Sequence, residues 1–287
     1  MRRQDLWSPS RSLNAMPFSC LPASLYPEIS SGERTLAGWF RLAAEIGLDG
    51  ADISVAHLDS LENRYLNGLR RQAQDAGVVI AGMVTYTDFT HPDPAVRLQH
   101  RQELRSYIDA AAQLGVSLLR VTAGQNHPGV SRQDGVSWAA EGLSEWVDEA
   151  NAAGVTLVYE NHAIGYVWTY FDFSQTASVF LEICDRTAGS GLQLLFDTAN
   201  LLAVDDDPLE VLDAVMPRVA AVHVSDIRQK GSFEPVLIGS GVTPLEAIFE
   251  RLRHAGFDGW ISVEEASKTG EEGFRQAIPK ARELWLN

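Results

Sequence analysis

Four short apolar runs of this chain each end in a side chain that can bind a metal ion. Glu160 closes "VTLVYE", Asp197 closes "LQLLFD", His223 closes "VAAVH" and Glu264 closes "WISVE". Three carboxylates and one imidazole form a hard, oxygen-rich set of donors. Such a set favours one divalent ion, with Mn²⁺ or Mg²⁺ preferred and Zn²⁺ or Co²⁺ as alternatives. The four residues therefore predict a metal centre, provided that the fold brings the ends of the runs together.

The pattern of apolar and amphipathic segments predicts that fold. Apolar runs of strand length lie near residues 16–21, 49–55, 78–85, 117–122, 155–160, 192–197, 219–224 and 260–264. Amphipathic stretches of helix length alternate with them, at roughly 33–47, 59–76, 93–114, 137–153, 174–188, 207–216, 243–255 and 270–285. Regular alternation of this kind is typical of a parallel sheet covered by helices. We predict a single-domain α/β protein, a (β/α)₈ TIM barrel over residues 16–287 after an N-terminal extension at residues 1–15.

Turn chemistry and histidine placement support the barrel. Glycines precede five of the expected strands, where they can take the left-handed conformation that ends a helix: Gly47, Gly77, Gly115, Gly154 and Gly256. A doubly wound open sheet is the alternative, but no G-x-G-x-x-G motif opens a helix. Most histidines fall at the end of an expected strand or in the loop after it, namely His57, His91, His127, His162 and His223. That is where the active site of a TIM barrel lies.

Composition and charge narrow the class of protein. A chain of 287 residues with 45% hydrophobic content can bury one large core. The formal net charge of −15 disfavours a nucleic-acid partner, because that affinity depends on Lys and Arg. Cys20 and Cys184 are too few and too far apart for a disulfide framework. The opening "MRRQDLWSPSRSLNAM" lacks the apolar core of a signal peptide, and no long apolar run follows. We expect a soluble cytoplasmic protein without a membrane partner.

The sequence blocks around the four run ends resemble those of a known group. "YENH", "LLFDTANLLA", "VAAVHVSD" and "IGSGVTPLEAIFERLRHAGFDGWISVEE" are similar to the strand-end blocks of the sugar isomerase and epimerase superfamily with the xylose isomerase-like barrel. This group includes ketose 3-epimerases, hydroxypyruvate isomerase and inosose dehydratase. The resemblance covers most of the chain and is strongest from Val155 onward. It implies a small carbohydrate substrate and one divalent metal ion bound by Glu160, Asp197, His223 and Glu264.

A metal ion in this position would support proton transfer at carbon. When it chelates adjacent hydroxyl and carbonyl oxygens of a sugar, it acidifies the hydrogen between them and stabilises the enediolate. The resemblance implies that Glu160 and Glu264, on opposite sides of the substrate, move this proton. We therefore predict a metal-dependent isomerase or epimerase that acts on a keto-sugar or a related polyol.

Further residues are expected to bind the substrate. His162 lies two residues after Glu160, so both side chains share one face if the strand continues. Arg228, five residues after His223, resembles the substrate-anchoring arginine of the family, and Asp226 can orient Arg228 or support the metal histidine. Trp168 belongs to the aromatic segment "IGYVWTYFDF". That segment can close over a sugar ring, stack on an aromatic aglycone, or form a contact in a homo-oligomer.

One departure from the family pattern leaves the reaction type open. Ketose epimerases typically carry a histidine three residues after the metal aspartate, where this chain has Asn200. Asn can hydrogen-bond a sugar hydroxyl but cannot carry a proton as imidazole does. A lyase or dehydratase acting on a keto-sugar or keto-inositol, including cleavage of 3-keto glycosides, is the main alternative. An apurinic endonuclease would need more metal ligands and a basic groove. A non-catalytic metal-binding barrel is the remaining hypothesis.

Overall fold

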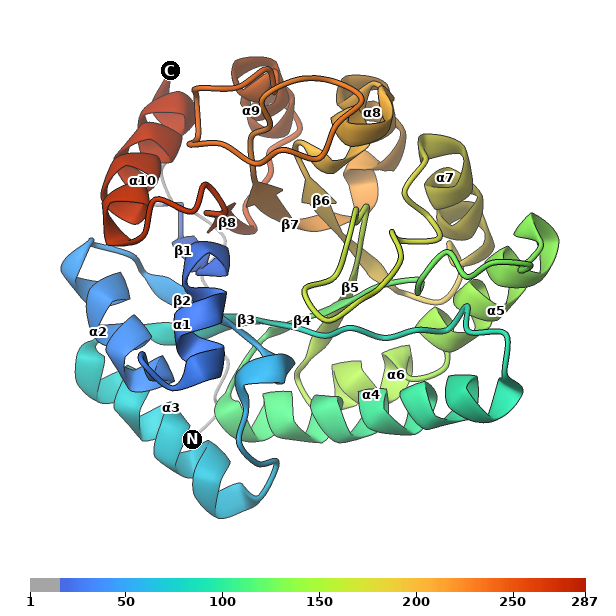
Figure 1. The fold of residues 1–287 in the computed structure, drawn as a ribbon, viewed down its shortest axis with the longest axis horizontal. Helices are drawn as coiled ribbons and strands as arrows, with labels where there is room; N and C mark the ends of the chain where they lie inside the picture. Colours follow the sequence, from blue (N-terminus) through green and yellow to red (C-terminus); the bar gives the residue numbers. More distant parts are fainter. Residues whose placement is uncertain (1–15) are drawn as a thin grey trace.

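Eight parallel strands form a nearly closed barrel in the computed structural model, which describes residues 16–287 (Figure 1). Their order is β1-β8-β7-β6-β5-β4-β3-β2. The strands are β1 Phe18–Leu21, β2 Gly50–Ser54, β3 Val79–Val84, β4 Leu118–Val121, β5 Thr156–Glu160, β6 Gln193–Asp197, β7 Val219–Val224 and β8 Trp260–Glu264. β1 meets the start of β2 through the backbone N–H of Asp49, which donates to the carbonyl of Phe18 at 2.9 Å. The predicted TIM barrel is confirmed.

Helices surround the barrel and connect its strands (Figure 1). They are α2 Leu36–Glu45, α3 Asn63–Ala76, α4 Pro94–Leu114, α5 Arg132–Ser144, α6 Val147–Ala152, α7 Ala177–Arg186, α8 Pro208–Val215, α9 Leu245–His254 and α10 Glu271–Leu286. The short helix α1 Tyr26–Ser31 lies inside this outer ring, in the loop between β1 and α2. Within the described residues, none of the helices combines the length and apolar character needed to cross a membrane.

The strand ends agree closely with the sequence pattern, whereas two helical regions differ from it. α1 was not predicted, because a helix of six residues is too short to show a periodic pattern. The helix expected over 137–153 is two helices, α5 and α6, because Trp146 leaves the helical conformation (φ −110°, ψ 11°). α5 begins early, at Arg132, because the Ser131 hydroxyl accepts the backbone N–H of Asp134 and caps the helix. The N-terminal extension expected at residues 1–15 lies outside the described residues.

The expected helix-ending glycines adopt the conformation that their position requires. All five have φ between 72° and 87°, a region that other residues rarely occupy: Gly47, Gly77, Gly115, Gly154 and Gly256. Each one turns the chain from an outer helix toward the next strand. Large apolar side chains such as Trp39, Phe40, Phe249 and Trp285 fill the space between the strands and these helices. This packed layer fixes the strands, and the strands in turn fix the residues at their ends.

Candidate metal centre

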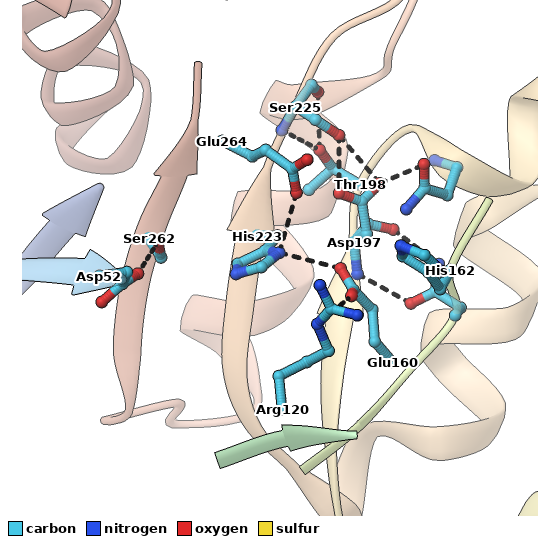
Figure 2. A network of polar contacts seen from close by, with 12 residues as sticks. Asp52, Arg120, Glu160, His162, Asp197, Thr198, His223, Ser225, Ser262 and Glu264 are labelled. Carbon is cyan, nitrogen blue, oxygen red and sulfur yellow. Dashed lines mark hydrogen bonds and ion pairs between the residues drawn. The ribbon is translucent and has the colours of Figure 1, made fainter. Parts of the chain in front are cut away.

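The four predicted ligands meet at one mouth of the barrel. Glu160, Asp197 and Glu264 are the last residues of β5, β6 and β8, and His223 is the next-to-last residue of β7. Each offers one ligand atom, and these atoms all lie within 4.8 Å of one another. Parallel strands end at the same edge of a barrel, which is why residues so distant in sequence come together. Figure 2 shows the four side chains converging from their separate strands.

The imidazole of His223 lies between two of the carboxylates. Its Nδ1 atom is 2.9 Å from Oε1 of Glu160 and 3.1 Å from Oε2 of Glu264. The two glutamates differ in accessibility, because the side chain of Glu160 is 1% exposed and that of Glu264 is 27% exposed. Glu264 is therefore the carboxylate that a molecule entering the mouth can reach, whereas Glu160 is enclosed.

Hydrogen bonds hold Asp197 in a fixed orientation. Its Oδ1 atom accepts the backbone N–H groups of Ala199 and Asn200 at 2.8 and 2.7 Å, and the Ser225 hydroxyl lies 2.9 Å from both carboxylate oxygens. The side chain of Asn161 bonds the backbone of Asp197 twice, donating to its carbonyl at 2.9 Å and accepting its N–H at 2.8 Å. A preoriented ligand costs less entropy to recruit, so these contacts favour ion binding.

Arg120 is a further charged group of the site, and sequence reasoning missed it. It lies in β4, is 4% exposed, and its Nε atom is 3.2 Å from Oε2 of Glu160 (Figure 2). The signal was present, because Arg120 is the single charged residue in the apolar run "LLRV". Asn161 and Ser225 were missed too, although each lies within two residues of a predicted ligand.

The charges of the site act strongly on one another. Burial and the carboxylates of Glu264 and Glu160 raise the pKa of Asp197 to about 8. Burial alone would raise the pKa of Glu160, but the charges of His223 and Arg120 outweigh it and lower the pKa to about 2. Burial alone would lower the pKa of His223, but Glu160 and Glu264 outweigh it and raise the pKa well above 6.5. Without an ion, Asp197 and His223 therefore hold protons at neutral pH.

The donor set fits a divalent cation. Oxygen atoms from three carboxylates and one imidazole nitrogen lie within 4.8 Å of one another, and hard divalent ions prefer such donors. Oε2 of Glu160 is buried and has no hydrogen-bond partner among the described residues. With all three carboxylates ionised and His223 neutral, as ligands of an ion must be, the carboxylates and Arg120 together carry a charge of −2, which one divalent ion would balance. These four residues therefore form the candidate metal site of the protein.

Three of the residues expected to bind substrate surround this group. His162 and Asn200 are buried beside it, and His162 lies next to Asp197 in Figure 2. Nδ1 of His162 is 3.3 Å from Oδ2 of Asp172, which orients the ring. The ring of Trp168 meets that of His162 edge-on at 5.3 Å. These contacts place Trp168 in the wall of the site, through His162.

Arg228 is not brought to the metal group. Its side chain is 66% exposed, and its Nε atom is 3.4 Å from the carboxylate of Glu234. Asp226, expected to support Arg228 or His223, accepts instead the backbone N–H groups of three residues in the following turn, Gly239, Gly241 and Thr243. The sequence spacing did not reveal this, because the loop after β7 folds back on itself: the N–H of Arg228 donates to the carbonyl of Glu234.

The aromatic segment after β5 is anchored to neighbouring loops of the mouth. Oε1 of Gln125 accepts the backbone N–H groups of Thr169 and Tyr170 at 2.8 and 3.1 Å, and Nε2 of Gln125 donates to Asp88 at 3.0 Å. On the other side, the hydroxyl of Tyr166 lies 3.2 Å from that of Ser30 in α1. The segment thus extends from the loop after β4 to the helix after β1, along the rim of the mouth.

Comparison with known proteins agrees with the fold. The family model described as "Xylose isomerase-like TIM barrel" matches residues 40–284. L-ribulose-5-phosphate 3-epimerase UlaE of Salmonella heidelberg (strain SL476) is 28% identical over 278 residues, covering 93% of this chain and 94% of the relative. Among solved structures, D-psicose 3-epimerase with D-tagatose from Clostridium cellulolyticum H10 has a TM-score of 0.76 at 16% identity, covering 94% of this chain and 99% of that one. The IOLI protein with a bound zinc atom has a TM-score of 0.76 at 18% identity, covering 94% and 98%.

Proposed function

This chain belongs to the xylose isomerase-like TIM barrel family, and from that premise we propose that it is a divalent-metal-dependent isomerase or epimerase of a keto-sugar or related polyol. The observation that carries the proposal is the convergence of Glu160, Asp197, His223 and Glu264, whose ligand atoms lie within 4.8 Å of one another. The relatives named epimerases support a carbohydrate substrate and proton transfer at carbon.

The residues of the mouth have different roles in this proposed reaction. A divalent ion, when held by the four ligands, supplies the positive charge that stabilises an enediolate. Glu264 is partly exposed and would take the proton from one face of the substrate carbon, and the more enclosed Glu160 would return a proton to the opposite face or to the neighbouring carbon. Trp168 and the aromatic segment exclude water from the reacting carbon. His162 and Asn200 are placed to hydrogen-bond substrate hydroxyls, and Asn200 keeps its donor and acceptor without titrating.

Deuterium exchange tests the proposal without assuming a product. Ribulose 5-phosphate, psicose, tagatose and fructose would be incubated in D₂O with the purified protein and Mn²⁺, and carbon-bound deuterium would be followed by NMR and mass spectrometry. We expect exchange that chelation abolishes and that Glu264→Gln slows by about a thousandfold or more. Glu265→Gln is the matched control, because Glu265 is a neighbouring buried glutamate that is not among the four ligands.

The same assay separates the competing functions. Exchange accompanied by loss of water or of an aglycone would identify a lyase or dehydratase, which uses the same carbanion but expels a leaving group. Metal analysis accompanies it: protein that binds no divalent ion, or activity that chelation leaves intact, would refute the proposed centre. A bound ion without exchange at any carbon of a broader keto-sugar and keto-inositol panel would indicate a non-catalytic metal-binding barrel.

A further inference from the structure

Arg120 places a positive charge inside the barrel beneath the metal ligands. It is 4% exposed and lies in a strand whose other side chains are apolar. In Figure 2 its side chain extends from β4 toward the carboxylate of Glu160. Burying a guanidinium is costly unless a charged partner compensates it, so its position needs a reason.

The partner of Arg120 is itself one of the four ligands. Nε of Arg120 lies 3.2 Å from Oε2 of Glu160, while Oε1 of Glu160 lies 2.9 Å from Nδ1 of His223. One carboxylate oxygen therefore faces the guanidinium and the other faces the ligand group. Nε and Nη1 of Arg120 are buried and make no regular hydrogen bond to any described residue, so the contact with Glu160 is one of charge rather than of ideal hydrogen-bond geometry.

Charge counting shows what the guanidinium contributes. Three ionised carboxylates and a neutral imidazole around a divalent ion would leave a net charge of −1 in a buried site. With Arg120 the sum is zero. An unbalanced charge in a low-dielectric interior is unfavourable, and a site of net charge −3 without the guanidinium would suit a trivalent ion better.

We propose that Arg120 is a positioning residue of the metal centre, which keeps Oε2 of Glu160 away from the ion and matches the charge of the site to a divalent cation. This inference rests on the proposed function, because it requires that the four ligands bind a metal. It also accounts for the unequal glutamates: both contact His223, but Glu160 is in addition held by Arg120, whereas Glu264 is 27% exposed and open to an entering substrate.

Binding of Mn²⁺ and Tb³⁺ alone tests the proposal without a substrate. Affinities would be measured by calorimetry and by terbium luminescence for the wild type, Arg120→Gln and Arg120→Lys. Arg120→Gln keeps a hydrogen-bond donor but removes the charge, so we expect Mn²⁺ to bind about tenfold more tightly and Tb³⁺ about thirtyfold, because the Coulomb energy scales with ion charge. Arg120→Lys keeps the charge, so both affinities should stay within about threefold of the wild type.

Each outcome separates the possible explanations. The role of charge would be overturned if the wild type and Arg120→Gln bound the ions with equal affinity, or if the Gln and Lys variants shifted the affinities equally. Weaker Mn²⁺ binding in Arg120→Gln would overturn it as well. A wild-type protein that binds neither ion would refute the metal centre itself. If Arg120→Gln does not fold, the double variant Arg120→Gln/Glu160→Gln removes the pair together. It should preserve the wild-type ratio of Tb³⁺ to Mn²⁺ affinity, and a change of about threefold or more in that ratio would contradict the proposal.

Discussion

Binding of a divalent ion to this site should release about two protons near pH 7. In the metal-free protein the pKa of Asp197 is raised to about 8 and that of His223 well above 6.5, so both side chains are mainly protonated. A metal ligand must be deprotonated, so the ion displaces both protons. The metal-free site then contains ionised Glu160 and Glu264, cationic His223 and Arg120, and neutral Asp197. It is neutral before the ion binds and neutral afterwards.

The size of the pH effect follows from this exchange. Each proton released contributes about 1.4 kcal/mol per pH unit to the binding free energy, so two protons contribute about 2.7 kcal/mol per unit. The Mn²⁺ affinity should therefore rise about a hundredfold between about pH 6 and 7. Above about pH 8 the slope should fall, because Asp197 has by then lost its proton in the metal-free protein as well.

Calorimetry measures the released protons directly. Mn²⁺ would be titrated at one pH into the protein in buffers of low and high protonation enthalpy, and the difference in heat gives the number of protons. Asp172→Asn is a matched control, because Asp172 is buried and its pKa is raised by burial, yet it bonds His162 and is not one of the ligands. Its proton count should equal that of the wild type. An affinity that does not change between about pH 6 and 7, with no buffer-dependent heat, would refute the reasoning.

Three more predictions follow from contacts of the same mouth. The raised pKa of Asp197 means that its contribution to stability is complete below about pH 4 and is lost as the pH rises through about 8. The Tm of the metal-free protein should therefore fall over this range. Bound Mn²⁺ should remove the fall. Gln125→Leu removes the acceptor of two backbone N–H groups in the segment 164–173, so hydrogen exchange of that segment should accelerate about tenfold while exchange in β5 is unchanged. Arg228→Ala removes an exposed ion pair, so it should change the free energy of unfolding by less than about 1 kcal/mol and turnover by less than about threefold. A large loss of turnover would show that Arg228 binds substrate after all.

Local sequence patterns predicted much of the fold and the set of metal ligands. Strands and helices alternate regularly, and each strand end is marked where an apolar run meets a polar residue, so Glu160, Asp197 and Glu264 could be placed within a residue of their observed positions. Short or interrupted helices were less visible, as α1 and the break at Trp146 show. Periodicity needs several turns before it differs from chance.

The sequence by itself determined which side chains end the strands and, through the parallel barrel, that they meet at one mouth. Only the tertiary structure decided which other groups join them. Arg120 enters the site because β4 and β5 are neighbours in the barrel, which brings its guanidinium to Glu160, whereas the loop after β7 folds back and pairs Arg228 with Glu234. Such choices depend on contacts between segments far apart in the chain and on loop conformation, and neither of these leaves a periodic signal in the sequence.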